Sequence, residues 1–299
     1  MPAALKLERA ARSLLYPVTK PEHRRRLIAA RDSGVSLLAS SRSRLRSERP
    51  LPDFIIAGVQ KGGTTFLFQE MLRHPEVRGA LTKEVHFFDS NWERGIDWYS
   101  GMFPSSRPGV TMIRGEASPV YIFHPLGVHR IADTLTDPRL IVIVRDPVQR
   151  ALSHYKHERR LGFEPCTTFE EALASEEERV AADFDAVRRG WTSQSFAVGH
   201  FSYTRRGLYA EQLKRAANAI GRDRVLVLVS EEMFADPRSS TAAALDFVGA
   251  TPHEIGPVGA NDMAFESAPM NPDTERMLRQ RFAEPNAELE EFLGRKLPW

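Results

Sequence analysis

The sequence predicts an α/β fold with three layers, in which a central parallel sheet is flanked by helices on both faces. Two short, wholly apolar segments at residues 54–57 and 140–144 have the composition of strands covered on both faces, and a third strand within residues 224–233 leads into a helix. Longer segments with helical periodicity separate these strands, as crossover connections require. Ligands of such sheets bind beyond the carboxyl ends of the strands, so the residues there are the first site candidates.

The first strand runs directly into a glycine turn and a helix. Residues 53–65 read DFIIAGVQKGGTT, with Gly62 and Gly63 in the turn and Thr64 and Thr65 at the start of the helical pattern. Such a turn lets backbone N–H groups point at an anion, and the helix N-terminus adds partial positive charge. The segment therefore predicts a phosphate-binding loop.

The spacing of this loop differs from the triphosphate-binding pattern GxxxxGK[ST] in one respect. Thr64 stands where that pattern has lysine, and the lysine of the loop lies earlier, at Lys61. A cation within the turn suits a shorter and less charged anion than a triphosphate. The alternative is a glycine-rich turn that only joins a strand to a helix.

The rest of the chain continues to alternate between helical and extended patterns. The further predicted elements are a helix from residue 64 to about residue 74, an apolar patch at 85–88, a helix at 95–103, a strand within 111–121, and helices at 126–135, 147–161, from Thr167 or Thr168, at 208–220 and at 274–293.

A second anion-binding position follows the strand at residues 140–144. Arg145 ends that strand, Pro147 begins the next helix and Ser153 lies two turns further on, so a forked guanidinium and a hydroxyl could reach one phosphate. Two alternatives remain. Asp146 could be the magnesium-holding acidic residue of a nucleotidase, or Arg145 and Asp146 could form a pair that only caps the helix.

Glu84 and His86 form a third candidate position. They alternate in the sequence, so in an extended segment both side chains point to the same side. A carboxylate and an imidazole that converge on one point suit removal of a proton from an attacking hydroxyl or amine. The alternative is that both are ordinary surface residues.

Composition places the chain among soluble globular proteins. It has 299 residues, of which 42% are hydrophobic and 27% charged, and no apolar run approaches the roughly 18 residues of a membrane span. Lys6, Arg9 and Arg12 interrupt the apolar residues of the N-terminus, which predicts a cytoplasmic protein. A single cysteine, Cys166, excludes an internal disulfide and a cysteine zinc cluster.

Charge is unevenly distributed between the two parts of the chain. Residues 1–50 carry twelve Lys and Arg against four Asp and Glu, although the net charge of the whole chain is only +2. We expect residues 1–50 to be a basic helical extension and linker, and residues 51–299 to be the main domain. The extension is either a solvated surface helix or an arm for peripheral contact with an anionic membrane or acidic polymer.

Three motifs in order carry a resemblance to a known family. GVQKGGTTFL, KEVHFFD and IVIVRDPVQRALSHY together resemble the sulfotransferases that use 3′-phosphoadenosine 5′-phosphosulfate (PAPS), in the branch of the heparan sulfate (glycosaminoglycan) sulfotransferases and their bacterial relatives. The likeness runs from about residue 53 to residue 299. It implies a fold like that of the P-loop-containing nucleotide hydrolases, with residues 51–299 as the sulfotransferase domain.

The resemblance also implies roles for the residues at the three positions. Lys61, Gly62, Gly63, Thr64 and Thr65 would surround the 5′-phosphosulfate, with Lys61 at the leaving phosphate oxygen; Arg145 and Ser153 would bind the 3′-phosphate. Glu84 would be the general base for the acceptor, with His86 assisting or orienting it. The product would be 3′-phosphoadenosine 5′-phosphate (PAP), and no metal is expected.

One region departs from the family pattern. Animal members of the branch have a cysteine-bridged segment and a Lys-Gly-Arg loop that helps to hold the nucleotide, whereas residues 264–272, AFESAPMNP, contain neither. Arg205 and Arg206 are candidates to replace the missing basic side chains. Tyr209 is either part of the nucleotide pocket or a core aromatic.

The acceptor is expected to be a carbohydrate, a glycolipid or a small hydroxylated metabolite, with a hydroxyl as the accepting group and an amine as the second option. Nucleic acid is not expected as a partner. The candidate basic residues of an acceptor cleft are Arg94, Arg114, Lys156, His157, Arg159 and Arg160. Two other functions remain open, a P-loop kinase with an irregular phosphate loop and a non-catalytic protein that binds anions or membranes.

Overall fold

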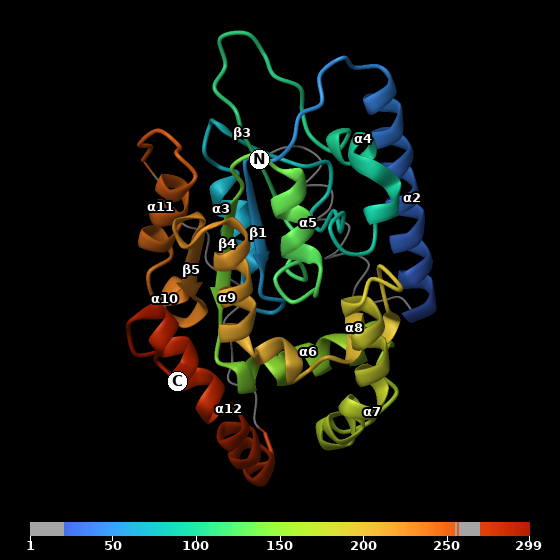
Figure 1. The fold of residues 1–299 in the computed structure, drawn as a ribbon, viewed down its shortest axis with the longest axis vertical. Coiled ribbons are helices and arrows are strands. Elements are labelled where there is room, and N and C mark those ends of the chain that lie inside the picture. Colours follow the sequence, from blue (N-terminus) through green and yellow to red (C-terminus); the bar gives the residue numbers. More distant parts are fainter. Residues whose placement is uncertain (1–20, 255, 257–269) are drawn as a thin grey trace.

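The computed structural model describes residues 21–254, 256 and 270–299. The apolar and basic segment before residue 21 and most of the AFESAPMNP segment lie outside the described residues. Figure 1 shows the strands at the centre of the ribbon, with helices α2 and α4 side by side along one margin and α12 at the C-terminal end.

The described elements alternate between strands and helices along the chain. The strands are β1 Phe54–Gly58, β2 Val77–Gly79, β3 Ile113–Ala117, β4 Arg139–Val144 and β5 Val225–Val229. The α-helices are α2 Pro21–Arg44, α3 Thr64–Met71, α4 Gly95–Ser100, α5 Gly127–Thr134, α6 Pro147–Leu161, α7 Phe169–Arg188, α8 Phe196–Phe201, α9 Tyr209–Ile220, α10 Ser230–Ala235, α11 Pro237–Phe247 and α12 Pro272–Leu293. Short 3-10 helices are η1 Trp92–Arg94, η2 Arg205–Gly207 and η3 Arg222–Arg224.

The five strands form one sheet in the order β2-β3-β1-β4-β5, and every neighbouring pair is parallel. The predicted parallel sheet is therefore confirmed. Since all strands run the same way, the carboxyl ends of β1, β3, β4 and β5 lie at one edge of the sheet.

Helices cover both faces of the sheet, as expected for apolar strands. Ile55 and Ala57 of β1 point to the face that α5 and α9 cover, whereas Phe54 and Ile56 point to the face that α3 and α11 cover. All four side chains are fully buried. This division explains why the strand is continuously apolar rather than alternating.

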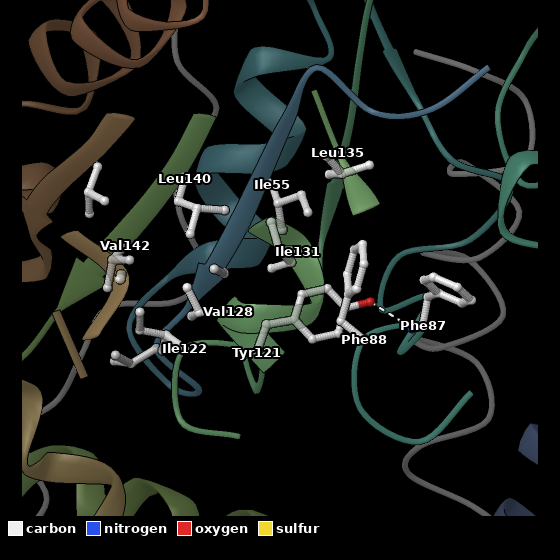
Figure 2. Packing of buried hydrophobic residues seen from close by; sticks show 14 of the residues in the cluster. Ile55, Phe87, Phe88, Tyr121, Ile122, Val128, Ile131, Leu135, Leu140 and Val142 are labelled. Carbon is white, nitrogen blue, oxygen red and sulfur yellow. Dashed lines mark hydrogen bonds between the residues drawn. The ribbon is translucent and has the colours of Figure 1, made fainter. Parts of the chain in front are cut away.

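The core on the α5 face extends beyond the sheet to the segment after β2. Figure 2 shows Phe87 and Phe88 packed in the same cluster as Tyr121 and Ile55, and the dashed line joins the Tyr121 hydroxyl to Phe87. The predicted apolar patch at residues 85–88 is thus buried. It anchors the loop of residues 83–89 to the core.

The sequence did not predict three of the described strands and α-helices. Strand β2 has only three residues, and α8 has six, so neither carries enough periodicity to be recognised. Helix α11 begins directly after α10, and Asp236 lies between the two helices. The side chain of Asp236 caps α11 by accepting a hydrogen bond from Ser239 N. The prediction of a strand that leads into a helix within residues 224–233 is confirmed, since β5 is followed directly by α10.

Helix α2 lies within the predicted extension and packs against α4. A Cβ atom on Gly101 would come within 2.1 Å of the Ala39 backbone oxygen, so the two helices approach with no room for a side chain at that glycine. Trp98 Nε1 and Arg94 Nη1 both donate to Ser36 Oγ, at 3.1 and 2.6 Å. The boundary near residue 50 stays a prediction.

Among the described helices, none combines the length and the hydropathy that crossing a bilayer would need.

Candidate functional site

The loops that follow four strands of the sheet meet at its carboxyl edge. After β1 comes the glycine turn, after β3 comes Ser118, after β4 comes Arg145, and after β5 comes Ser230. The segment before η1 joins them, because Glu84 N donates to the Ala117 backbone oxygen at the end of β3. The candidate phosphate-binding and base residues therefore lie at the same edge.

Steric contacts fix the glycine turn. Val59 N donates to the backbone oxygen of Ile143 at 3.1 Å, which ties the turn to β4. A Cβ atom at Gly62 would lie 2.4 Å from that same Ile143 oxygen, and one at Gly63 would lie 2.6 Å from Met233 Cε. Gly63 also has a left-handed φ of 100°. Gly62 therefore allows a close approach of backbone to backbone, and Gly63 provides the left-handed conformation that follows it.

Helix α3 begins immediately after the turn and presents its N-terminus there. Its cap residue, Gly63, offers no side-chain acceptor, and no acidic residue lies in its first turn. Thr64 is buried and Thr65 is half-buried. A helix start without its own capping group is suited to an external anion, which the hydroxyl of Thr65 could also contact.

Lys61 is the cation of the turn and has an unusual electrostatic environment. Burial lowers its pKa, the positive charges of Arg160 and Arg145 add to the lowering and Glu84 opposes it, so that the pKa is about 8. Arg145 Nη1 donates to the Lys61 backbone oxygen at 3.1 Å. Cations crowded in this way favour an anionic ligand, whose charge would restore the ordinary pKa of the lysine.

Arg145 is buried where β4 ends, and its backbone is held from behind. The Tyr209 hydroxyl donates to the Arg145 backbone oxygen at 2.9 Å, so Tyr209 is a core aromatic that supports the arginine. Burial lowers the pKa of Arg145. Ser153 is half-buried on α6, the helix that begins just after Arg145.

Asp146 has two structural partners. It caps α6 by accepting from Val148 N at 2.9 Å, and it forms an ion pair with Arg279 Nη2 of α12 at 2.7 Å. The carboxylate considered above as a magnesium ligand is thus engaged in joining α6 to α12. Among the described residues, no group of three or more His, Cys, Asp or Glu is placed to hold a metal ion.

The loop of residues 83–89 brings Glu84 and His86 together, but not in the predicted way. We expected an extended segment, and this is wrong, since Glu84 and His86 have left-handed φ values of 64° and 56°. His86 Nε2 lies 3.7 Å from Glu84 Oε2, so the side chains converge nevertheless. Left-handed conformations at non-glycine residues are uncommon and concentrate at functional sites.

Two residues of the KEVHFFD motif that the sequence analysis did not single out complete this loop. Lys83 is buried and its Nζ lies 2.6 Å from Glu84 Oε1, while His86 Nδ1 lies 2.9 Å from Asp89 Oδ2. The four side chains form a chain of alternating charge. The sequence could have indicated Lys83 and Asp89 as well, because all four charged residues belong to the seven-residue motif KEVHFFD.

The charges of this loop stabilise one another. Burial alone would raise the pKa of Glu84, but Lys83 and His86 lower it well below its usual range. Burial would lower the pKa of His86, yet Asp89 and Glu84 raise it well above its usual value. At neutral pH the site therefore holds an ionised carboxylate beside an imidazolium.

Helix α6 carries two of the predicted acceptor residues towards these groups. The pKa of His157 is lowered to about 4, mainly by burial and also by the charges of Lys61 and Arg160, while Glu84 acts in the opposite direction. Arg160 Nη2 lies 3.0 Å from His157 Nδ1. Both residues are therefore within electrostatic reach of the lysine and the carboxylate.

The other predicted acceptor residues serve elsewhere. Arg114 lies near the amino end of β3, away from the site, and donates to the Pro104 backbone oxygen. Arg94 contacts Ser36 of α2, and Arg159 donates to the Glu164 backbone oxygen. Lys156 is exposed on α6.

Arg205 and Arg206, considered as substitutes for a basic nucleotide loop, make contacts with α7 and α8. Arg205 Nη2 pairs with Glu177 Oε1 at 2.7 Å. Arg206 is buried, donates to the Gly199 backbone oxygen at 3.0 Å and lies over the ring of Phe123. These contacts hold both side chains against α7, α8 and Phe123, and not towards a ligand at the edge of the sheet.

Comparison with known proteins agrees with this geometry. Residues 51–272 match the family described as the sulfotransferase domain. The chain is 34% identical over 202 residues to the mouse heparan sulfate glucosamine 3-O-sulfotransferase 6, an alignment that covers 67% of this chain and 53% of that protein. It is 25% identical over 315 residues to the membrane-associated sulfotransferase kil1 of Dictyostelium discoideum, covering 83% and 66% of the two chains.

A solved structure is also similar. The crystal structure of a sulfotransferase from Alicyclobacillus acidocaldarius aligns with a TM-score of 0.67 and 30% identity, covering 83% of this chain and 98% of that one. The chain spans about half the length of the mouse heparan sulfate relative, 53%. The predicted resemblance and fold are confirmed.

Proposed function

This chain belongs to the sulfotransferase domain family, and we propose that it transfers a sulfuryl group from PAPS to a hydroxyl of a carbohydrate or glycolipid acceptor. The observation that carries the proposal is that the ionised Glu84 and the half-buried cation Lys61 lie on loops at the same edge of the sheet. The charge of Glu84 acts directly on the pKa of Lys61, which burial and two arginines lower to about 8. A base and an anion-binding cation thus lie within electrostatic range of each other.

The residues of the glycine turn fit a phosphate-containing donor. Gly62 and Gly63 let the turn pack closely against the protein behind it and lead into the uncapped N-terminus of α3, and Lys61 and Arg145 supply positive charge there. PAPS, when bound, supplies the sulfuryl group and a phosphate leaving group. Lys61 would stabilise the negative charge that develops on the leaving oxygen, and Arg145 with Ser153 would hold the 3′-phosphate.

The loop of residues 83–89 fits the accepting side. Glu84 would take the proton of the attacking hydroxyl as the new S–O bond forms and the S–O bond to the leaving phosphate breaks. His86, held by Asp89, would orient Glu84, and Lys83 would keep it ionised. The low pKa of Glu84 means that it is deprotonated before the acceptor binds.

A carbohydrate acceptor is supported by the named heparan sulfate relatives and by the position of α6. The charges of Lys61 and Glu84 act on His157, which Arg160 contacts, so these two residues of α6 could reach hydroxyl or acidic groups of a sugar at the site. An amine is the second option for the accepting group. The sugar and the position sulfated are left to the experiment.

Calorimetry with two nucleotides in the presence of a chelator tests the donor. We expect tight binding of PAP and weak or undetectable binding of ATP, because the turn lacks the lysine that spans a triphosphate. Tight ATP binding that depends on magnesium, with no binding of PAP, would replace the proposal by a kinase function. Mass spectrometry of a panel of glycans, glycolipids and hydroxylated metabolites incubated with PAPS would then identify the acceptor by a gain of one sulfuryl group.

A further inference from the structure

We propose that Glu116 is a positioning residue for the base: it forces the hydroxyls of Ser118 and Tyr121 to act as acceptors for the backbone N–H groups of the loop that carries Glu84. The proposal rests on the role of Glu84 proposed above. It assigns a function to a buried polar cluster beside the site, on the carboxyl end of β3.

Glu116 is a fully buried carboxylate with three hydroxyl donors. Tyr99 donates to its Oε1 at 2.5 Å, Ser118 donates to Oε2 at 2.7 Å and Tyr121 donates to Oε1 at 3.1 Å. Burial raises the pKa of Glu116, and these three hydrogen bonds oppose the rise. Three hydroxyls that donate to the two carboxylate oxygens are the arrangement that an ionised Glu116 accepts.

An ionised carboxylate can only accept hydrogen bonds, so it fixes the direction of its partners. A hydroxyl has one proton and two lone pairs, and once that proton points at Glu116 only the lone pairs remain for other neighbours. The pKa of Tyr121 is raised well above its usual value, first by burial and then by the charge of Glu116, so it keeps the proton that it donates. Ser118 and Tyr121 can then serve the loop only as acceptors.

The loop offers two donors in the matching places. His86 N donates to Ser118 Oγ at 3.2 Å and Phe87 N donates to Tyr121 Oη at 2.7 Å. Figure 2 shows the Tyr121 hydroxyl directed at Phe87 across the core. Together with the bond from Glu84 N to the Ala117 oxygen, these contacts tie the loop to the end of β3.

These bonds hold residues whose backbone would otherwise relax. Glu84 and His86 have left-handed φ values of 64° and 56°, which cost free energy for side chains with a Cβ atom and persist only where the surroundings impose them. The bonds from Glu84 N, His86 N and Phe87 N all end on the segment from β3 to Tyr121. Loss of the acceptors should move the carboxylate of Glu84, and a small displacement of a base is costly to catalysis.

The test compares two variants, each of which loses the hydroxyl oxygen of one tyrosine of the cluster. Tyr121→Phe removes the acceptor of Phe87 N, whereas Tyr99→Phe removes a hydroxyl that also donates to Glu116 but makes no bond to a loop N–H group. Both residues are fully buried. Ser118→Ala is compared in the same way with Ser118→Thr, which retains a hydroxyl, and Glu116→Gln places an amide donor in the cluster.

We expect Tyr121→Phe, Ser118→Ala and Glu116→Gln each to lower kcat by about tenfold or more, with PAP affinity within about twofold of the unchanged protein. Tyr99→Phe should keep kcat within about threefold even where it lowers the melting temperature as much as Tyr121→Phe. Ser118→Thr should restore most of the kcat lost in Ser118→Ala. Hydrogen–deuterium exchange of the peptide that covers residues 84–89 should accelerate in Tyr121→Phe and not in Tyr99→Phe.

Equal kcat in Tyr121→Phe and Tyr99→Phe would overturn the proposal, as would a loss of kcat in Tyr121→Phe without faster exchange of the loop. If Glu116→Gln fails to fold, the comparison of the two tyrosines decides alone. Glu84→Gln separates this inference from the proposed function: full activity in that variant removes the base itself, whereas inactivity in Glu84→Gln with normal Tyr121→Phe removes only the positioning role.

Discussion

The two loops of the site, residues 58–65 and residues 83–89, reach unusual backbone conformations by different means. In the glycine turn, Gly62 and Gly63 allow the conformation because a Cβ atom at either position would clash with neighbouring atoms, and Lys61 between Val59 and these glycines also has a left-handed φ, of 73°. In the base loop, Glu84 and His86 have full side chains and left-handed φ values, and hydrogen bonds from the loop to Ala117, Ser118 and Tyr121 hold them. Glycines in the sequence therefore mark the first conformation, whereas no residue type in the loop marks the second.

The charges of the two loops differ in the same way. The glycine turn gathers cations, so the pKa of Lys61 falls to about 8 through burial and the nearby arginines. The base loop alternates cations and anions, so Glu84 and His86 keep their charges in spite of burial. We infer that the turn awaits an anionic ligand, whereas the base loop is electrostatically complete before any ligand binds.

The largest effect should come from the base. Glu84→Gln keeps the shape of the side chain but cannot take a proton, so we expect kcat to fall by about 10³-fold, within the range of general-base catalysis. PAP affinity, measured by calorimetry, should stay unchanged. A variant with full activity would show that another group accepts the proton.

Lys61→Ala should affect both binding and chemistry, unlike Glu84→Gln. In the proposed mechanism the lysine contacts the leaving group, so its loss should lower kcat by about 10²-fold and also weaken PAP binding. Steady-state kinetics and calorimetry on the same preparation separate the two losses. A variant in which only PAP binding changes would place Lys61 away from the reacting bond.

The steric origin of the glycine turn can be tested by adding one methyl group. Gly62→Ala places a Cβ atom against the Ile143 backbone oxygen, and we expect the free energy of unfolding to fall by about 1–3 kcal/mol, with loss of PAP binding. Gly34→Ala is the matched control, since nothing lies within 4 Å of a Cβ atom there and the residue is in α2. The control should be stabilised by about 0.5–1 kcal/mol. Equal changes in the free energy of unfolding of Gly62→Ala and Gly34→Ala, measured by urea denaturation, would contradict the steric account.

The smallest predicted effect is a pH dependence of nucleotide binding. Lys61 binds an anion best when protonated, and its pKa in the free protein is about 8. Below that pH the lysine is already charged, so affinity should be independent of this group. Above it, PAP affinity should fall by up to about tenfold per pH unit, until the higher pKa of the complex is reached. Lys61→Arg stays charged over this range and should remove the dependence; an unchanged slope in that variant would assign it to another group.

The sequence predicted the parallel sheet and the glycine turn because both depend on local patterns. Continuous apolar runs mark strands covered on both faces, and glycines mark the turn at residues 62 and 63. It also indicated that Glu84 and His86 converge. The reason given, an extended segment, was wrong, because the acceptors that impose the left-handed φ values lie more than 30 residues later in the chain.

The roles of other charged residues could not be predicted either, because they too depend on partners that are distant in the sequence. Asp146 follows an apolar strand like a magnesium ligand, but its partner Arg279 lies 133 residues away on α12. Arg114 was a candidate for the acceptor cleft because it is basic. It lies at the amino end of β3, away from the site, and this position is evident only from the strand register. Long-range pairing decides which charged residues are free to serve a ligand.

The most direct test of the account is a crystal structure of the protein with PAP. The account predicts the 5′-phosphate against the backbone N–H groups of residues 62–65 with Lys61 beside it, the 3′-phosphate on Arg145 and Ser153, and the carboxylate of Glu84 facing the 5′ end. A nucleotide that binds elsewhere, or Lys61 and Arg145 directed at different ligands, would contradict it.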